Sequence, residues 1–268
     1  MPVIVKPDNP LLLPYRSQKD GAGIGKEYFI ADGDKAVIKL LQSELEVENI
    51  FCLSNYYETH KALILQKLPE EKVFMASKED MESFMGFPIH QGFMALAKKP
   101  KEKPITEIQS PVIVLNGLVD AENVGSIVRT SLAFGCKSLL IDEKTCEPYI
   151  RRAVRVALGN TFLLDIYRVK HLKEIFPLLK EKGFQMIAAS ARKMGEEKNR
   201  NVYEFSFPET FALVIGNEGR GIDSFVRHTA DILLQIPISE EAGSLNAGLA
   251  TAILLSHYQK EKFLKSGK

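Results

Sequence analysis

Three polar stretches in the second half of the chain carry residue types that could bind a ligand and act on it. They cover residues 123–129, 216–221 and 244–246. Asn and Ser exchange hydrogen bonds with hydroxyl groups, Arg clamps phosphates, and glycines let backbone N–H groups approach a small molecule. If the fold brings the three stretches together, they form a site for an anionic ligand.

The third stretch stands at a predicted helix start. The apolar run of residues 232–236 is typical of a strand, and Pro237, which cannot donate a backbone hydrogen bond, ends it. After a loop, Ser244 and Asn246 stand where a long helix should begin, and their side chains can accept from the N–H groups of its first turn. Such a helix start is suited to binding an anion.

The first stretch puts Asn123 at another predicted helix start, with Arg129 about one and a half turns later. One interpretation is a capping Asn and a surface Arg. However, Arg129 has apolar neighbours, including Ile127 and Val128, and a cation in such surroundings needs an anionic partner or a phosphate. We therefore count both Asn123 and Arg129 as candidate site residues.

The second stretch follows an apolar strand of residues 211–215 and contains three glycines, Gly216, Gly219 and Gly221. Glycines at this density allow positive φ and let backbone N–H groups face a ligand. A glycine-rich loop alone is weak evidence for a site. Glu218 strengthens the case, because a plain turn has no need for a carboxylate between glycines.

The elements that must position these stretches alternate between strand and helix. The predicted strands are residues 111–115, 138–141, 162–166, 185–189, 211–215 and 232–236, and the predicted helices are residues 123–134, 149–157 and 171–182 and a long one after Asn246. The continuous apolar run of residues 111–115 is typical of a strand buried on both faces, so we expect an α/β domain with a parallel sheet. Ligands bind at the carboxyl ends of such strands.

Residues 27–98 predict a smaller α/β domain. Its predicted strands are residues 28–30, 50–53, 72–75 and 92–97, and its predicted helices are residues 34–41, 57–67 and 78–85. Residues 1–26 form a lead-in, in which Gly21 to Lys26 lack the spacing of a phosphate-binding loop. Residues 99–110, rich in Lys, Glu and Pro, are the predicted linker. His90, just before the last strand, is more often a turn residue than a ligand.

Composition limits the possible functions. The chain has 268 residues, of which 45% are hydrophobic and 26% charged, as in a globular protein, and it has neither a long apolar run nor a leader. We therefore expect a cytoplasmic protein with no membrane span. Three cysteines without CxxC spacing argue against a disulfide framework and against a metal site.

A net charge of +1 gives no global signal for nucleic-acid binding. If RNA binds, it must use local basic patches. The candidates are Lys98, Lys99, Lys101 and Lys103; Arg151, Arg152 and Arg155; and Arg192 with Lys193. For each patch, an ordinary solvated surface is the alternative interpretation.

The three stretches, read as NVGSIVR, LVIGNEGRGI and IPISEEAGSLNAGLATA, resemble motifs 1, 2 and 3 of the SpoU (TrmH) family of RNA ribose 2′-O-methyltransferases, in the family's order. The resemblance covers residues 111–260 as a catalytic domain. Residues 1–100 are more weakly similar to the L30e-like substrate-binding domain that often precedes it, with His90 where that domain closes. Ser131, where Ala is common, and Ala247 with Gly248, which replace bulkier residues, are small departures.

The resemblance implies a deep trefoil knot, S-adenosylmethionine as the cofactor, and a homodimer formed through the catalytic domain, whose active sites take residues from both subunits. It implies these cofactor-binding residues: Gly216, Gly219, Ile236 and Leu245. It implies these catalytic residues: Asn123, Arg129, Glu218, Ser244 and Asn246.

The expected function is therefore methyl transfer to a ribose 2′-hydroxyl of structured RNA, more in keeping with rRNA than with tRNA. Because a guanidinium does not readily lose a proton, we expect Arg129 to clamp the adjacent phosphate and stabilise the developing alkoxide. Target choice is expected to lie in residues 1–105 and in the basic patches. One alternative is a catalytically silent RNA-binding protein of the same fold. A Rossmann-type enzyme is disfavoured, since no G-x-G-x-x-G follows Val112.

Overall fold

A computed structural model describes residues 1–16, 26–89, 91–190 and 198–265. The chain forms two compact units, Met1–Lys101 with Pro148–Leu163, and Glu102–Glu147 with Leu164–Lys268. Each unit is built from two separate parts of the chain. The sequence predicted instead a single linker at residues 99–110. His90 and the Arg192–Lys193 patch lie outside the described residues.

The first unit contains a five-stranded mixed sheet in the order β1-β4-β3-β5-β2. The strands are β1 (Val3–Ile4), β2 (Tyr28–Asp32), β3 (Val47–Cys52), β4 (Val73–Met75) and β5 (Phe93–Lys98). The helices are α1 (Leu13–Arg16), α2 (Asp34–Gln42), α3 (Ser54–Lys67) and α4 (Lys78–Met85). The strands and helices predicted between residues 28 and 98 are all present, with ends shifted by a few residues. Cys52 is buried in β3, and burial raises the pKa of its thiol to about 12.

Two ion pairs with Asp32 and aromatic contacts with Phe29 join the segment Pro148–Leu163 to this unit. It contains α6 (Arg151–Val156). The Nε of Arg151 donates to Asp32 Oδ2 at 2.9 Å, and its Nη1 donates to the carbonyl of Tyr15 at 3.0 Å. The side chain of Arg151 is only 16% exposed, so the proposed patch of three arginines does not present Arg151 to RNA.

The strand predicted at residues 162–166 is wrong in its first half. Leu158 and Gly159 have φ of 53° and 75°, which end α6 and start a turn. A 3₁₀ turn (Asn160–Leu163) follows, in which Phe162 packs on Phe29, and the strand β8 (Asp165–Arg168) begins only after it. Apolar residues that pack in a turn have the same composition as a strand.

The second unit contains a seven-stranded sheet in the order β10-β12-β9-β11-β6-β7-β8, and its neighbouring strands are parallel throughout the described residues. Besides β8, the strands are β6 (Val112–Asn116), β7 (Ser138–Ile141), β9 (Gln185–Ala189), β10 (Asn199–Asn201), β11 (Phe211–Gly216) and β12 (Ile232–Gln235). The predicted parallel α/β architecture is confirmed. The short polar strand β10 was not predicted.

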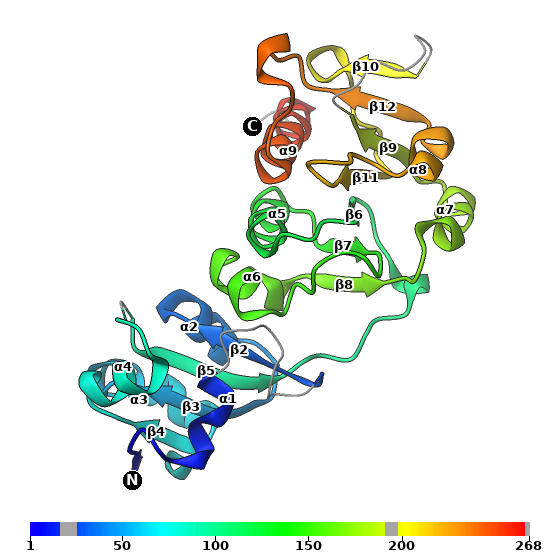
Figure 1. The fold of residues 1–268 in the computed structure, drawn as a ribbon. Coiled ribbons are helices and arrows are strands. Elements are labelled where there is room, and N and C mark those ends of the chain that lie inside the picture. The colour runs from blue at the N-terminus through cyan, green and yellow to red at the C-terminus, as the bar shows by residue number, and fades with distance from the viewer. Residues whose placement is uncertain (17–25, 90, 191–197, 266–268) are drawn as a thin grey trace. The chain divides into compact units, whose positions relative to one another are not determined.

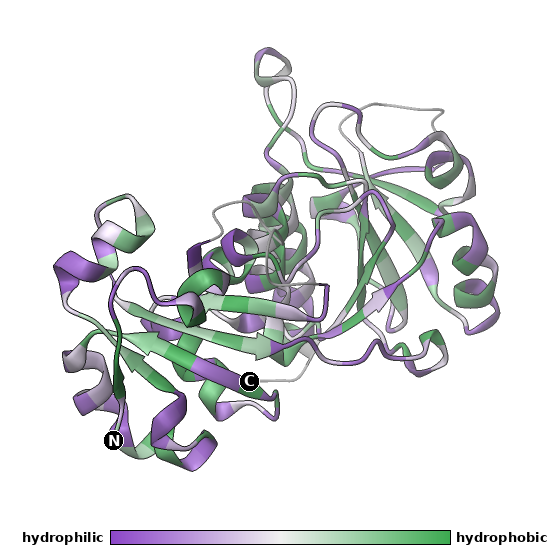
Figure 2. Cartoon of the chain, turned by 60° about the horizontal axis from the view of Figure 1, so that its bottom comes forward, coloured by the Kyte–Doolittle hydropathy of each residue, from purple (hydrophilic) through white to green (hydrophobic). Residues whose placement is uncertain are grey.

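Four helices cover the two faces of this sheet within the described residues. They are α5 (Ala121–Ala133), α7 (Leu172–Glu181), α8 (Ser224–Thr229) and α9 (Ala247–Lys265). In Figure 1, α5 and α9 lie on one side of the sheet and α7 and α8 on the other. Burial explains why residues 112–115 of β6 are apolar: Val112 and Val114, for example, pack with Phe176 of α7 and Val226 of α8. In Figure 2 the strands are mostly green, the colour of hydrophobic residues, with some purple, hydrophilic segments.

The strand order brings the candidate stretches to one edge of this sheet. Strand β11 lies between β6 and β9, with Gly216 in register with Asn116, so the loops after β6, β9, β11 and β12 leave the same carboxyl edge. Helices α5 and α9 pack closely, since a Cβ on Gly248 would lie 2.8 Å from Ser126 Oγ. None of the helices in the described ranges is both long and apolar enough to cross a membrane.

Candidate active site

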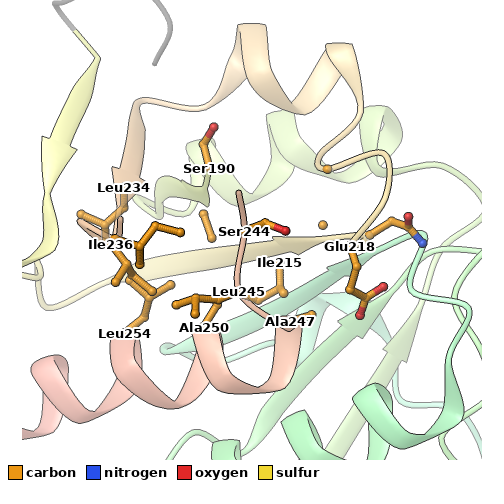
Figure 3. Close-up of a pocket in the computed structure, with 15 residues that line it drawn as sticks. Ser190, Ile215, Glu218, Leu234, Ile236, Ser244, Leu245, Ala247, Ala250 and Leu254 are labelled. Carbon is orange, nitrogen blue, oxygen red and sulfur yellow. The ribbon is translucent and has the colours of Figure 1, made fainter. Parts of the chain in front are cut away.

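A pocket opens at the carboxyl edge of the sheet, between the ends of β9, β11 and β12 and the first turns of α9. It is lined by Ala189, Ser190, Ile215, Gly216, Asn217, Glu218, Gly221, Leu234, Ile236, Ile238, Ser244, Leu245, Ala247, Ala250 and Leu254. Figure 3 shows Leu234, Ile236 and Leu254 at one end of the pocket and Glu218 at the other. The pocket therefore has an apolar end and an end with a carboxylate.

Gly216 tolerates no side chain. A Cβ at this position would lie 2.5 Å from both the carbonyl carbon of Gly221 and the backbone nitrogen of Ile222. The loop returns so tightly because Asn217 and Gly221 exchange backbone hydrogen bonds of 3.1 and 2.7 Å. The close return therefore requires glycine at this position, and the wall of the pocket here is backbone.

Gly219, predicted to bind the cofactor, does not line the pocket. The side-chain oxygen of Asn217 accepts from the N–H of Gly219 at 3.0 Å and from that of Arg220 at 3.1 Å. The backbone donor of Gly219 is thus used within the loop. A Cβ there would meet only Asn217 Oδ1, at 3.5 Å, so this position has room for a side chain.

A line of hydrogen bonds joins one residue from each predicted stretch. Asn246 Nδ2 donates to Asn123 Oδ1 at 2.7 Å, and Asn123 Nδ2 donates to Glu218 Oε1. Asn123 is 8% exposed, so its amide depends on these protein partners rather than on water. The fold therefore brings together three polar groups that are far apart in the sequence.

Asn246 has a second role as the N-cap of α9. Its Oδ1 accepts from the N–H of Gly248 at 2.9 Å and from that of Leu249 at 3.2 Å. Asn123, by contrast, is not a cap: Asp120 caps α5 through a 2.7 Å bond to the N–H of Glu122. The interpretation of Asn123 as a capping residue is therefore wrong, and Asn246 combines capping with contact to the site.

Arg129 does not join the other predicted residues within one chain. It stands six residues after Asn123, which places it about 120° around α5 from that residue. Its side chain is exposed, and no residue in the described part of the chain forms an ion pair with it. Its apolar neighbours, Ile127 and Val128, are buried while Arg129 is exposed, so of the two partners expected for it, an anionic residue or a phosphate, the phosphate stays a prediction.

The sequence prediction missed most of the apolar lining of the pocket. Ala247, Ala250 and Leu254 line it from one face of α9, at the i, i+3 and i+7 spacing of a helix face. Ala189 and Ser190 line it from the end of β9. The predicted strand ends and the helical period could have identified these residues, but the identity of such small residues carries no chemical signal.

The sequence matches the model of the SpoU rRNA Methylase family over residues 110–256. An uncharacterised tRNA/rRNA methyltransferase of Mycobacterium bovis is 27% identical over 271 residues, covering 97% of this chain and 91% of that protein. A 23S rRNA (guanosine 2′-O)-methyltransferase of Bacillus subtilis is 27% identical over 184 residues, covering 69% of this chain and 71% of that protein.

Solved structures share the fold. An AdoMet-bound rRNA methyltransferase from Sinorhizobium meliloti superposes with a TM-score of 0.79 at 21% identity, covering 96% of this chain and 97% of that one. The AdoMet complex of the methyltransferase AviRb from Streptomyces viridochromogenes gives a TM-score of 0.74 at 19% identity, covering 89% of this chain and 92% of that one. These likenesses extend over both compact units.

Proposed function

The chain belongs to the SpoU rRNA methylase family, and we propose that it transfers a methyl group from S-adenosylmethionine to a ribose 2′-hydroxyl of RNA, with rRNA preferred to tRNA. The observation that carries this proposal is the hydrogen-bonded line of Glu218, Asn123 and Asn246 beside a pocket at the carboxyl edge of the sheet. The B. subtilis relative, named as a 2′-O-methyltransferase of 23S rRNA, supports the choice of atom and of RNA class.

The pocket fits a nucleoside cofactor. Its apolar end, with Leu234, Ile236 and Leu254, suits an adenine ring, and the side-chain-free wall at Gly216 lets backbone approach a ligand. We assign cofactor contacts to Gly216, Ile236 and Leu245 and a loop-shaping role to Gly219. We further propose that the loops that carry these residues form a trefoil knot, as the resemblance implies.

The reaction forms a bond from the ribose 2′-oxygen to the methyl carbon, breaks that carbon's bond to sulfur and releases the hydroxyl proton. The bound cofactor supplies the methyl group as a sulfonium electrophile. Asn123 keeps one N–H and one oxygen lone pair for the ribose, since Glu218 and Asn246 use the others. Together with Ser244, it holds the hydroxyl in line for attack. Glu218 acts through Asn123, which it orients.

The outward position of Arg129 fits a homodimer in which Arg129 serves the partner subunit's site. There it would clamp the phosphate next to the target ribose and stabilise the developing alkoxide. This assignment combines the exposure of Arg129 with its place in the family's first motif. The first compact unit, in the same proposal, is the L30e-like domain that contributes to the choice of target RNA.

Isothermal titration of S-adenosylmethionine into the purified chain tests the cofactor assignment. We expect saturable one-to-one binding per chain, and no comparable binding of ATP, which shares the adenosine but lacks the methionine. Absence of S-adenosylmethionine binding to the folded chain would refute the proposal and favour a catalytically silent RNA-binding protein.

A further inference from the structure

A second hollow lies at the same carboxyl edge of the sheet, beyond the ends of β7 and β8. It is lined by Asp142, Lys144, Lys170, His171, Leu172, Lys173, Asp223, Phe225 and Val226. None of the basic patches predicted from the sequence includes these lysines, which come from two separate segments, after β7 and after β8. The fold alone brings them together.

The carboxylates of this hollow already have partners. Asp142 is 4% exposed and accepts from Asn116 Nδ2 at 3.0 Å, Gly117 N at 3.1 Å and Thr145 Oγ1 at 2.7 Å. Asp223 accepts from the same Asn116 side chain at 3.1 Å. Internal donors thus hold Asp142, and among the described residues Asp223 forms an ion pair with Lys144 but with neither Lys170 nor Lys173.

Two ammonium groups are left for a ligand. Lys144 approaches Asp223 at 3.6 Å, and His171 approaches Glu143 at 3.3 Å. Lys170 and Lys173 are exposed and have no ion pair within the residues that the structure describes. Exposed lysines in a hollow carry the charge that attracts the phosphates of a nucleic-acid backbone.

A short hydrogen-bonded path connects this hollow to the active-site loop. Gly117 donates its N–H to Asp142, and its carbonyl accepts from Asn217 Nδ2 at 3.2 Å. Asn217 precedes Glu218 and lines the cofactor pocket. An RNA chain that places a ribose beside Glu218 can therefore continue along the same edge into the lysine hollow.

An exposed aromatic ring lies at the far side of this hollow. Phe225 of α8 is 36% exposed, and its ring packs on Phe176 with centroids 5.6 Å apart. The ring also lines an adjoining groove with Lys173, Lys180 and Lys198, of which the last two donate to backbone carbonyls near the end of α8. An aromatic ring among lysines is the arrangement by which proteins hold single-stranded nucleic acid.

We propose that this surface binds a single-stranded segment of the substrate RNA next to the methylated nucleotide, with its phosphates on Lys170 and Lys173 and a base stacked on Phe225. The inference rests on the proposed function and extends it, because it assigns part of substrate binding to the catalytic unit. It predicts that the catalytic unit prefers unpaired RNA around its target.

The charge component is tested by fluorescence titration of the full chain with labelled oligouridylate at several salt concentrations. We expect the double variant Lys170→Gln/Lys173→Gln to bind more weakly, with a slope of log K against log salt shallower by about 1.4, at roughly 0.7 per lost phosphate contact. The matched control is Lys137→Gln/Lys182→Gln, whose exposed lysines precede β7 and β9 at the opposite, amino edge. Equal slopes for the two variants would overturn the proposal.

The stacking component is tested at Phe225. We expect Phe225→Leu, which keeps apolar packing on Phe176, to weaken oligouridylate binding roughly tenfold, whereas Phe225→Tyr retains it. Unchanged binding by the Leu variant, or a change in oligomeric state instead of RNA affinity, would contradict the inference. Titration with S-adenosylmethionine separates the two proposals: a wild-type chain that binds no cofactor defeats the methyltransferase function, while the oligouridylate comparison still decides this one.

Discussion

At the scale of single residues, the site depends on hydrogen bonds that satisfy one buried amide. Burying the side-chain amide of Asn123, which is 8% exposed, would lower stability if the amide had no hydrogen-bond partners. Glu218 and Asn246 are these partners. Local sequence indicated Glu218 as a candidate because a carboxylate between glycines is unusual, and Asn123 because it stands at a predicted helix start six residues before Arg129. Their mutual contact could not be predicted, because it depends on which strands are neighbours in the sheet.

The role of Glu218 as a positioning residue predicts a difference between two substitutions. Glu218→Gln keeps an oxygen that accepts from Asn123 Nδ2, so it should retain most methyl-transfer activity, whereas Glu218→Ala should lose activity on the order of a hundredfold through misplacement of Asn123. The Ala variant should also unfold about 1–3 kcal/mol more easily in urea, because the Asn123 amide loses its partner. Equal inactivity of both variants would instead make the carboxylate a proton acceptor.

Substitution of Gly216 and of Gly219 by alanine should affect cofactor binding differently. Gly216→Ala forces a Cβ to within 2.5 Å of backbone atoms, so titration calorimetry should detect no S-adenosylmethionine binding, with loss of stability. Gly219→Ala meets only one side-chain oxygen at 3.5 Å and should bind the cofactor nearly as wild type does. Loss of binding in both variants would mean that Gly219 contacts the cofactor directly.

At the scale of elements, periodicity and breakers located most strands and helices, and the exceptions have physical causes. The apolar strand of residues 111–115 and the helix ended by Gly135, with φ of 77°, were identifiable because their signals are local. Residues 162–163 were wrongly predicted as part of a strand, because an apolar turn that packs on Phe29 has the same composition as a strand. The strand β10 was missed because its residues, Asn199–Asn201, are polar, and a short polar segment that pairs with β12 has no apolar pattern to mark it as a strand.

Asn246 allows the helix cap and the site contact to be separated. Asn246→Asp keeps an oxygen acceptor for the first turn of α9 but cannot donate to Asn123, so stability should hold while methyl transfer falls. Asn246→Ala removes both contacts and should cost about 0.5–2 kcal/mol of unfolding free energy as well as activity. Urea unfolding and initial rates measure the two effects. Full activity in the Asp variant would show that the contact with Asn123 is dispensable.

At the scale of the whole molecule, the position of Arg129 has no explanation within a single chain. Sequence reasoning placed it in the site with the other motif residues, and the fold places it on the outer face of α5 instead. A homodimer reconciles the two, since an exposed cation can complete the site of a second copy. Neither periodicity nor composition predicts which surface meets a partner, because surface side chains tolerate both solvent and an interface.

Mixed dimers test this assignment. Arg129→Ala and Gly216→Ala homodimers should both be inactive, but a co-expressed mixed dimer combines an intact cofactor pocket with an intact Arg129 across the interface. We expect about half of the wild-type rate, because one of two symmetric sites is complete. Glu218→Ala serves as the second partner if Gly216→Ala does not fold. No recovery of activity would place Arg129 in the site of its own chain.

The central claim is the transfer of a methyl group to a ribose oxygen, and transfer of labelled methyl from S-adenosylmethionine to RNA tests it most directly. The substrate is total RNA from a strain that lacks the protein, and the labelled product is digested with alkali. We predict that the label is recovered in one alkali-resistant dinucleotide, because a methylated 2′-oxygen can no longer attack the adjacent phosphate. Label recovered on a base, with every linkage cleaved by alkali, would contradict the account.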